Sequence, residues 1–177
     1  MRVRVLASAL WLSLAAGCSH YELGSSARLP FHTLYVTPVA NKVLLPQAQA
    51  IVSTQLRRKF EEDGRVELVD SAADADATLT VVITDYHREI AAVRENDTGL
   101  ASKFVLTLGV TCTLRDNNSS KPFFEKRVVT VQEGSYTDNG MPSSVAPGDQ
   151  LQSEYNTLPL LADALADKVS HVVLDVW

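Results

Sequence analysis

Cys18 is the residue whose type and surroundings indicate the most specific chemistry in this chain. Arg2 and Arg4 precede an apolar stretch at residues 5–16, and three small residues stand directly before the cysteine. A positively charged start, a short apolar segment and small residues at its end are the pattern of an export signal with a cleavage site. As a helix the stretch would be about 18 Å long, which is shorter than the roughly 30 Å hydrocarbon core of a bilayer. The sequence therefore predicts that residues 1–17 are a removable signal peptide.

The segment ending at Cys18 resembles a bacterial lipobox, in which the cysteine becomes the first residue of the mature protein and is acylated on sulfur and on the new amine. This resemblance implies a covalent lipid on Cys18, with residues 18–28 as a lipidated tether; ordinary secretion without lipid is the alternative. Ser19 stands where an aspartate would, in enterobacteria, favour retention at the inner membrane. The same resemblance therefore implies the periplasmic face of the outer membrane, where several acyl chains anchor a protein stably.

The other reactive side chains form no recognised catalytic or metal-binding pattern. No glycine-rich phosphate loop or serine nucleophile elbow occurs, and zinc-type spacing is lacking among the four histidines, His20, His32, His87 and His171. Asp74 and Asp76 are predicted to be solvated turn residues. Cys112 lies within an alternating apolar run and is predicted to be a small buried hydrophobe. We expect no enzyme activity, no metal, and no cofactor beyond the lipid on Cys18.

The charge of the chain argues against a general nucleic-acid-binding function. The formal net charge is −5, and removal of the signal peptide leaves 14 basic and 21 acidic residues, a charge of −7. Nucleic-acid binding needs a basic face, which this balance does not favour. The 160 residues from position 18 onwards are the size of one domain and are long enough to bury a core. We therefore expect one domain over residues 29–177.

Patterns of apolar residues predict five strands and two helices in this domain. Strands are predicted at residues 31–39, 66–68, 78–86, 103–115 and 123–132, the last two as an antiparallel hairpin. The first helix begins at Pro46 and ends at Gly64, with a helical stripe of apolar residues. The second begins near Thr157, with Pro159 in its first turn. Residues 134–150, between the last strand and the second helix, are predicted to be a long polar loop that serves a function or is disordered.

This order predicts an α+β domain built as a two-layer sandwich. The two main helices are expected to pack on one face of a mixed, mostly antiparallel β-sheet of about five strands. The opposite face carries Thr, Lys and Arg side chains and has no helix left to cover it. We expect this face to be wet or to meet a partner.

Several short segments occur in an informative order along the chain. The cysteine is followed by Tyr-Glu-Leu-Gly at 21–24, a strand at 34–41, a helix ending at 60–64, an Ala-Asp pair at 75–76 before Leu79, and Asp85-Tyr86. In this order they resemble the lipopolysaccharide-assembly lipoprotein family LptE. The similarity extends from Cys18 to about Leu114, and the order of strands and helices matches to the end.

This resemblance implies an outer-membrane lipoprotein that assembles with and plugs the LptD β-barrel, so that lipopolysaccharide is transported to and inserted at the cell surface. The implied partners are the barrel, lipopolysaccharide and, through the lipid anchor, the membrane. Lipopolysaccharide is anionic, so an acidic chain would need a local basic patch to contact it. The candidates on neighbouring strands are Lys103, Lys126 and Arg127; ordinary solubility charges are the alternative for these residues.

Two other functions are compatible with a lipoprotein of this helix-on-sheet plan. One is a periplasmic activator of a peptidoglycan synthase, and the other is an auxiliary lipoprotein of another envelope lipid-transport system.

Overall fold

Three long strands form most of the sheet: β4 (Ala77–Val93), β5 (Ala101–Asp116) and β6 (Pro122–Tyr136). β5 lies between the other two and is antiparallel to both, which confirms the predicted hairpin of β5 and β6. The computed structural model describes residues 29–93, 101–137 and 148–175. The predicted signal peptide, Cys18 and the tether lie outside these described residues, as does most of the predicted loop at 134–150.

Three short strands add a parallel part to the sheet. β1 (Thr33–Val36) lies between β3 (Glu67–Leu68) and β4 and is parallel to both, while β2 (Ala40–Asn41) pairs in parallel with β4 further along. The order is β3-β1-β4-β5-β6, with β2 beside β4. The sheet has six strands rather than about five because a short strand, β2 at 40–41, follows the predicted strand at 31–39 after a break. Pro38 lies in the break, where its missing N–H removes a ladder donor.

The first helix agrees with the sequence pattern. α2 (Pro46–Asp63) buries Ala48, Val52, Leu56 and Phe60, which lie at helical spacing on one side. Gly64 ends the helix in the left-handed conformation at φ +70°, and its N–H donates to the Phe60 carbonyl. None of the helices among the described residues has the length and hydropathy needed to cross a membrane.

The second helix is longer than the sequence predicts. α3 (Gly148–Leu174) begins well before Thr157, and Pro159 lies in its interior rather than in its first turn. The predicted loop at 134–150 is also wrong at both ends, because residues 134–136 belong to β6 and 148–150 to α3. Pro159 is tolerated because it lies on the exposed side of the helix. Proline has no N–H to donate, and water can donate instead to the helix carbonyl that is left without a partner.

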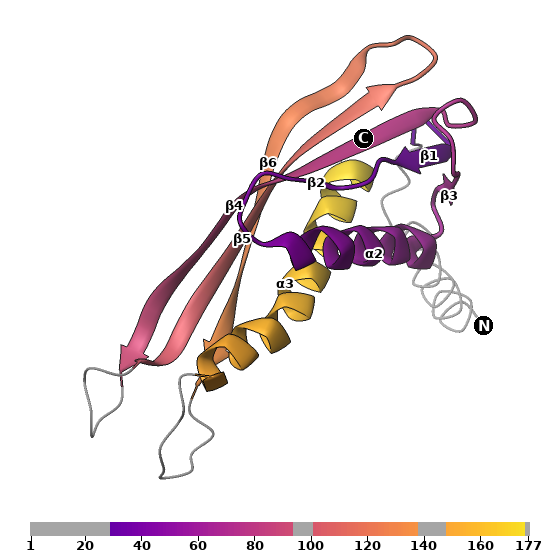
Figure 1. The fold of residues 1–177 in the computed structure, drawn as a ribbon. Helices are drawn as coiled ribbons and strands as arrows, with labels where there is room; N and C mark the ends of the chain where they lie inside the picture. The colour runs from indigo at the N-terminus through magenta and orange to yellow at the C-terminus, as the bar shows by residue number, and fades with distance from the viewer. Residues whose placement is uncertain (1–28, 94–100, 138–147, 176–177) are drawn as a thin grey trace, which may run out of the picture.

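Both helices lie on the same side of the sheet, as predicted (Figure 1). On this side the long strands bury Leu79, Val81 and Ile83 of β4 and the alternating apolar residues of β5 from Phe104 to Leu114. The opposite face presents threonines in register, such as Thr80 beside Thr113, and no helix covers it within the described part of the chain. The protein is therefore a two-layer α+β sandwich with one open sheet face.

The far half of the sheet extends beyond the short strands. On β4, the pairing with β1 and β2 is confined to residues 77–83. Beyond these residues β4, β5 and β6 continue as a three-stranded arm. α2 covers the other half, and the first half of α3 lies along the arm (Figure 1).

Asp76 connects the start of β1 to the start of β4. Its carboxylate accepts the N–H groups of His32 at 2.9 Å and Thr33 at 3.1 Å, and the Asp76 N–H donates to the Thr33 hydroxyl. The bonds from His32 and Thr33 hold the pKa of Asp76 below its usual value. We expected a solvated turn residue, so this structural role is a correction; Asp74 in the same turn is exposed as expected.

Replacing Asp76 with Ala should lower the free energy of unfolding by about 1–2 kcal/mol at neutral pH, because two backbone donors lose a charged acceptor. The folded pKa is depressed, so this stabilisation is complete above the unfolded pKa and is lost as the pH falls through the folded pKa. The difference between Asp76→Ala and the parent should therefore shrink below about pH 4. Urea unfolding at neutral and acidic pH measures it. Asp74→Ala is the control, and equal losses in both variants would contradict the assignment.

Cys112 is fully buried in the middle of β5 and is a free thiol, which confirms the predicted small buried hydrophobe. Burial raises its pKa to about 12, so the reactive thiolate is scarce at neutral pH. We expect no maleimide labelling at Cys112 in the folded chain and complete labelling in urea, as measured by peptide mass. Rapid labelling of the folded chain would show that the β5 core opens to solvent.

Candidate interaction surfaces

The described residues contain no group of three potential ligands that could hold a metal ion. His87 lies on β4 with its Nδ1 3.1 Å from the carboxylate of Asp85, and both side chains are about half exposed. His171 lies on α3 between the carboxylates of Asp167 and Asp175. These two histidines have ordinary carboxylate partners on the protein surface.

Lys103 lies at the far end of the arm, on the open face of the sheet. Its ammonium is 5.0 Å from the centre of the Tyr136 ring, across the β5–β6 pair. Gly134 leaves the room for this contact, since a Cβ at that position would lie 3.1 Å from Cε of Lys103. Tyr136 is exposed. A cation above an exposed aromatic ring is accessible to an anionic ligand from solvent.

Lys126 and Arg127 lie at the other end of the sheet. The ladder between β5 and β6 is interrupted there, Lys126 has a φ of +51°, and its N–H donates to the Thr113 hydroxyl. Arg127 occupies the register position of Cys112, whose face the helices cover, and its guanidinium is 4.5 Å from the centre of the Phe124 ring. Because the register is irregular here, simple strand alternation does not decide which face of the sheet each of these two adjacent basic residues occupies.

The three candidate residues therefore lie on neighbouring strands, as expected, but do not meet in one patch. Lys103 and the register position of Arg127 are nine residues apart along β5, which is roughly 30 Å at about 3.4 Å per residue. One phosphate group cannot contact both ends. Any contact with an anionic ligand has to be considered separately for Lys103 and for the Lys126–Arg127 pair.

A groove of about 400 Å³ lies between the loop before α2, β4 and the first half of α3. We call it the α2–α3 groove. Apolar and aromatic side chains make up most of its lining, and the complete set is Leu44, Leu45, Gln47, Tyr86, Leu151, Glu154, Tyr155 and Leu158. Its volume is within the range of small-molecule sites.

Local structure explains how the groove is formed. The side chain of Asn41 accepts the Val43 N–H and donates to the Leu45 carbonyl, which folds the loop before α2 into a fixed turn. This turn presents Leu44 fully exposed. On the other wall, the α3 residues 151, 155 and 158 follow helical spacing and share one side of the helix.

A polar cluster lies at the groove beside Tyr86. Arg88 of β4 forms an ion pair with Glu154 of α3, whose side chain is only 16% exposed, and Gln150 also donates to Glu154. The guanidinium of Arg88 is 5.0 Å from the centre of the Phe104 ring. Burial, and then the negative charge of Glu154, raise the pKa of Tyr86. This cluster fixes the first half of α3 to the arm.

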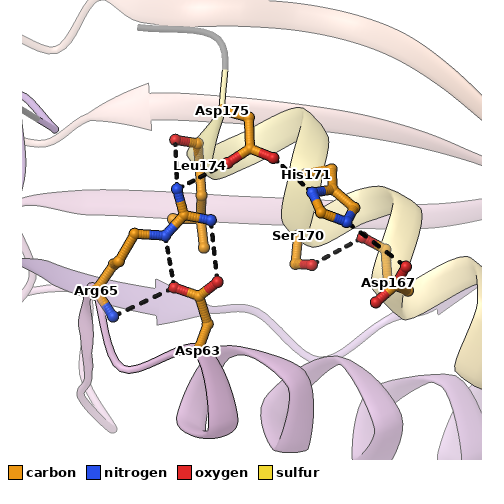
Figure 2. A network of polar contacts seen from close by, with 7 residues as sticks. All are labelled: Asp63, Arg65, Asp167, Ser170, His171, Leu174 and Asp175. Atoms are coloured by element: carbon orange, nitrogen blue, oxygen red, sulfur yellow. Dashed lines mark hydrogen bonds and ion pairs between the residues drawn. The ribbon is translucent and has the colours of Figure 1, made fainter. Parts of the chain in front are cut away.

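A second polar network fixes the opposite ends of the helices. Arg65, just after α2, donates to Asp63 at 2.7 Å and to Asp175 at 2.7 Å, and Asp175 also contacts His171 (Figure 2). The pKa of Arg65 is raised, mainly by its bond to Asp63, and the pKa values of both carboxyl groups are lowered. The charges in this network compensate one another, which indicates a structural role.

The α2–α3 groove and its polar cluster were not predicted from the sequence. Predicted β4 ended at Tyr86, so Arg88 was not assigned to a strand. The predicted second helix begins near Thr157 and the predicted loop ends at 150, so Glu154 is assigned to neither. The spacing of Leu151, Tyr155 and Leu158 was the available signal, since it continues the apolar stripe of the helix towards the N-terminus.

Replacing Glu154 with Ala should loosen the first half of α3, because Arg88 loses its buried carboxylate partner. We expect a loss of about 1–2 kcal/mol, limited by the partial hydration of Arg88. Hydrogen exchange should accelerate in the amides of residues 150–157 and stay unchanged at 165–174. Glu125→Ala, which removes an exposed ion pair with Arg115, is the control. Unchanged exchange in Glu154→Ala would show that the cluster does not hold the helix.

Comparison with known proteins identifies the family. None of the curated proteins matches the chain. Among solved structures, uncharacterised lipoprotein B from Nitrosomonas europaea is similar at a TM-score of 0.53 and 16% identity, over 84% of this chain and 86% of that one. Rare lipoprotein B from Shewanella oneidensis gives 0.52 and 13%, over 81% and 95%. At such low identities, the structural likeness shows similarity of fold alone. The family model described as LptE, lipopolysaccharide-assembly, matches residues 31–170, and the chain therefore belongs to the LptE family.

Proposed function

We propose that this protein is an outer-membrane lipoprotein that assembles with and plugs an LptD-type β-barrel for lipopolysaccharide transport and insertion at the cell surface. It acts as a companion of the barrel and not as an enzyme. Cys18 carries the lipid that holds the domain at the periplasmic face of the membrane.

The observation that carries this proposal is the open face of the sheet. Both helices cover the opposite face, so the threonine-rich side remains accessible over the length of three strands. Thr130 and Gln132 continue this polar surface on β6, and both are exposed. A barrel lumen is lined by polar side chains. A polar, uncovered sheet face is suited to such a lumen. Polar groups on the two surfaces can bond to each other, so few of them lose water without gaining a partner.

Lipopolysaccharide contact is proposed separately for the two ends of the sheet. Lys103 is the better candidate, because it lies on the open face and its ammonium has an exposed aromatic neighbour. Lys126 and Arg127 form the second candidate position, in which Arg127 already stacks on Phe124.

Mild detergent extraction of the full-length chain should recover it in a stoichiometric complex with a β-barrel. Intact mass should show acylated Cys18, and Cys18→Ser should release the chain from the membrane fraction. Isolation of the wild-type chain with a penicillin-binding synthase and no barrel would favour the alternative of a synthase activator.

Replacing Lys103 with Glu should weaken lipopolysaccharide binding by about tenfold, since one charge-assisted contact is exchanged for repulsion. Lys121→Glu, which reverses an exposed charge in the β5–β6 turn, is the matched control. Lys126→Glu and Arg127→Glu are measured separately, and circular dichroism checks the fold. Equal affinity in Lys103→Glu and Lys121→Glu would remove Lys103 from the contact surface.

A further inference from the structure

We propose that residues 148–158 of α3, which we call the flap, are hinged at Pro159 and detach from the arm while the rest of α3 stays packed. The flap and the rest of the helix differ in burial and in the contacts that hold them, and the proline lies where the two parts meet. This movement does not depend on the proposed partnership with a barrel.

The flap contributes little to the apolar core. Its apolar side chains at 150–156, Leu151 and Tyr155, are 69% and 59% exposed, and Leu158 is buried only where the flap meets the hinge. Burial of apolar surface is the main stabilising contribution to packing, so the rest of the helix is held far more strongly. Beyond the proline, the apolar side chains at 0–1% exposure are Leu161, Ala162, Leu165, Ala166, Val169, Val173 and Leu174.

Polar contacts hold the flap to the arm. Glu154 forms the ion pair with Arg88 of β4, which remains partly hydrated. The hydroxyl oxygen of Ser153 lies 2.7 Å from that of Ser135, and Ser153 also donates to the Tyr136 carbonyl at 2.6 Å. Water replaces such contacts when the flap detaches, so the net contribution of each is small. The flap can therefore open without unfolding of the domain.

The rest of α3 has its own attachments to the helical layer. Asp163 forms ion pairs with Arg58 at 2.6 Å and Lys59 at 3.6 Å, both on α2. Arg65, just after α2, donates to Asp175, just after α3 (Figure 2). These attachments all lie beyond the proline, so they stay in place when the flap moves.

Pro159 interrupts the hydrogen bonding of the helix at the junction of the two parts. Without an N–H it cannot donate to the Tyr155 carbonyl four residues earlier, and its ring crowds that carbonyl. The backbone is thus weakened at the position where apolar burial also changes. A detached flap is too short to be a stable isolated helix, since helices below roughly 12–15 residues are marginal in water. Detachment should therefore also melt the flap.

Opening of the flap uncovers the helix side of the arm. Leu106 of β5 lies on this side between Arg88 and Glu133 in register, and it is fully buried. Phe104, two residues away on the same face, is 5% exposed. Within the described residues, the first half of α3 is the helix that lies along this part of the sheet (Figure 1). The flap thus determines whether an apolar strip of the arm faces water.

Hydrogen exchange of the purified full-length chain, followed by mass spectrometry, tests the hinge. We expect the amides at 150–158 to exchange about a hundredfold faster than those at 161–174, with a step at Pro159. Protection that rises gradually along α3 would indicate fraying from the end of the helix. Equal protection on both sides of the proline would indicate one rigid helix. Either result would overturn the proposal.

A disulfide between the flap and β6 provides a lock. Ser135→Cys with Ser153→Cys places two thiols where the hydroxyl oxygens are 2.7 Å apart. Oxidation should abolish the step in protection at Pro159, because the flap can no longer leave the arm. The same double variant kept reduced is the matched control. A step that persists in the oxidised protein would contradict a hinged flap.

Pro159→Ala tests the hinge without added cysteines. The flap should become about tenfold better protected, because the helix regains a backbone donor at this position. Pro122→Ala, at the start of β6, is the matched control and should leave exchange in α3 unchanged. An unchanged step at position 159 in the alanine variant would show that the proline is not the hinge.

Maleimide labelling shows whether opening uncovers the arm. Leu106→Cys places a thiol under the flap, and the native Cys112, fully buried on the same face of β5, is the internal control. We expect labelling at 106 to be about tenfold faster than at 112 in the folded chain, and to be slowed by Pro159→Ala. Circular dichroism checks the fold of each variant. Equal rates at 106 and 112 would show that the arm stays covered and would overturn the proposal.

Discussion

Burial of one face of the long β-strands under two helices is the interaction on which the rest of this structure depends. Leu79, Val81 and Ile83 of β4 and the alternating residues of β5 place a continuous apolar surface on one side. Within the described residues α2 and α3 cover it, and no helix there covers the other side. A one-residue shift in strand register would exchange the two faces, which is why the alternation fixes the pairing so strongly. The open polar face, the three-stranded arm and the α2–α3 groove are all consequences of this one-sided covering.

Much of the fold was predictable from the sequence because strand alternation and helical spacing are local patterns. The alternation from Phe104 to Leu114 defined β5, and Gly64 marked the end of α2. The far half of β4 was missed because charged residues such as Arg88 occupy positions that apolar residues hold earlier in the strand. The start of α3 was misplaced because Pro159 is typical of a first helical turn, whereas here it is tolerated on an exposed side. A local sequence pattern does not show that the tertiary structure accommodates a charged residue within a strand or a proline within a helix.

The candidate surfaces were less predictable, because they depend on contacts between distant parts of the chain. Arg88 and Glu154 are 66 residues apart in sequence, and no spacing rule relates them. Lys103 and Arg127 were correctly assigned to neighbouring strands, but their separation along the sheet depends on the register and on the irregularity near Lys126. Figure 2 shows the same principle in the helical layer, where Arg65 joins Asp63 to the distant Asp175.

Membership of the LptE family and the one-sided fold are the two observations behind the proposal that the open sheet face meets the barrel. The most direct test of that proposal is maleimide labelling of Val128→Cys. The buried Cys112 gives no background, and under the proposed acylation Cys18 has no free thiol to label. The account predicts protection of this cysteine in native membranes and rapid labelling once the chain is separated from the barrel. Equal labelling rates in both states would contradict docking through the open face.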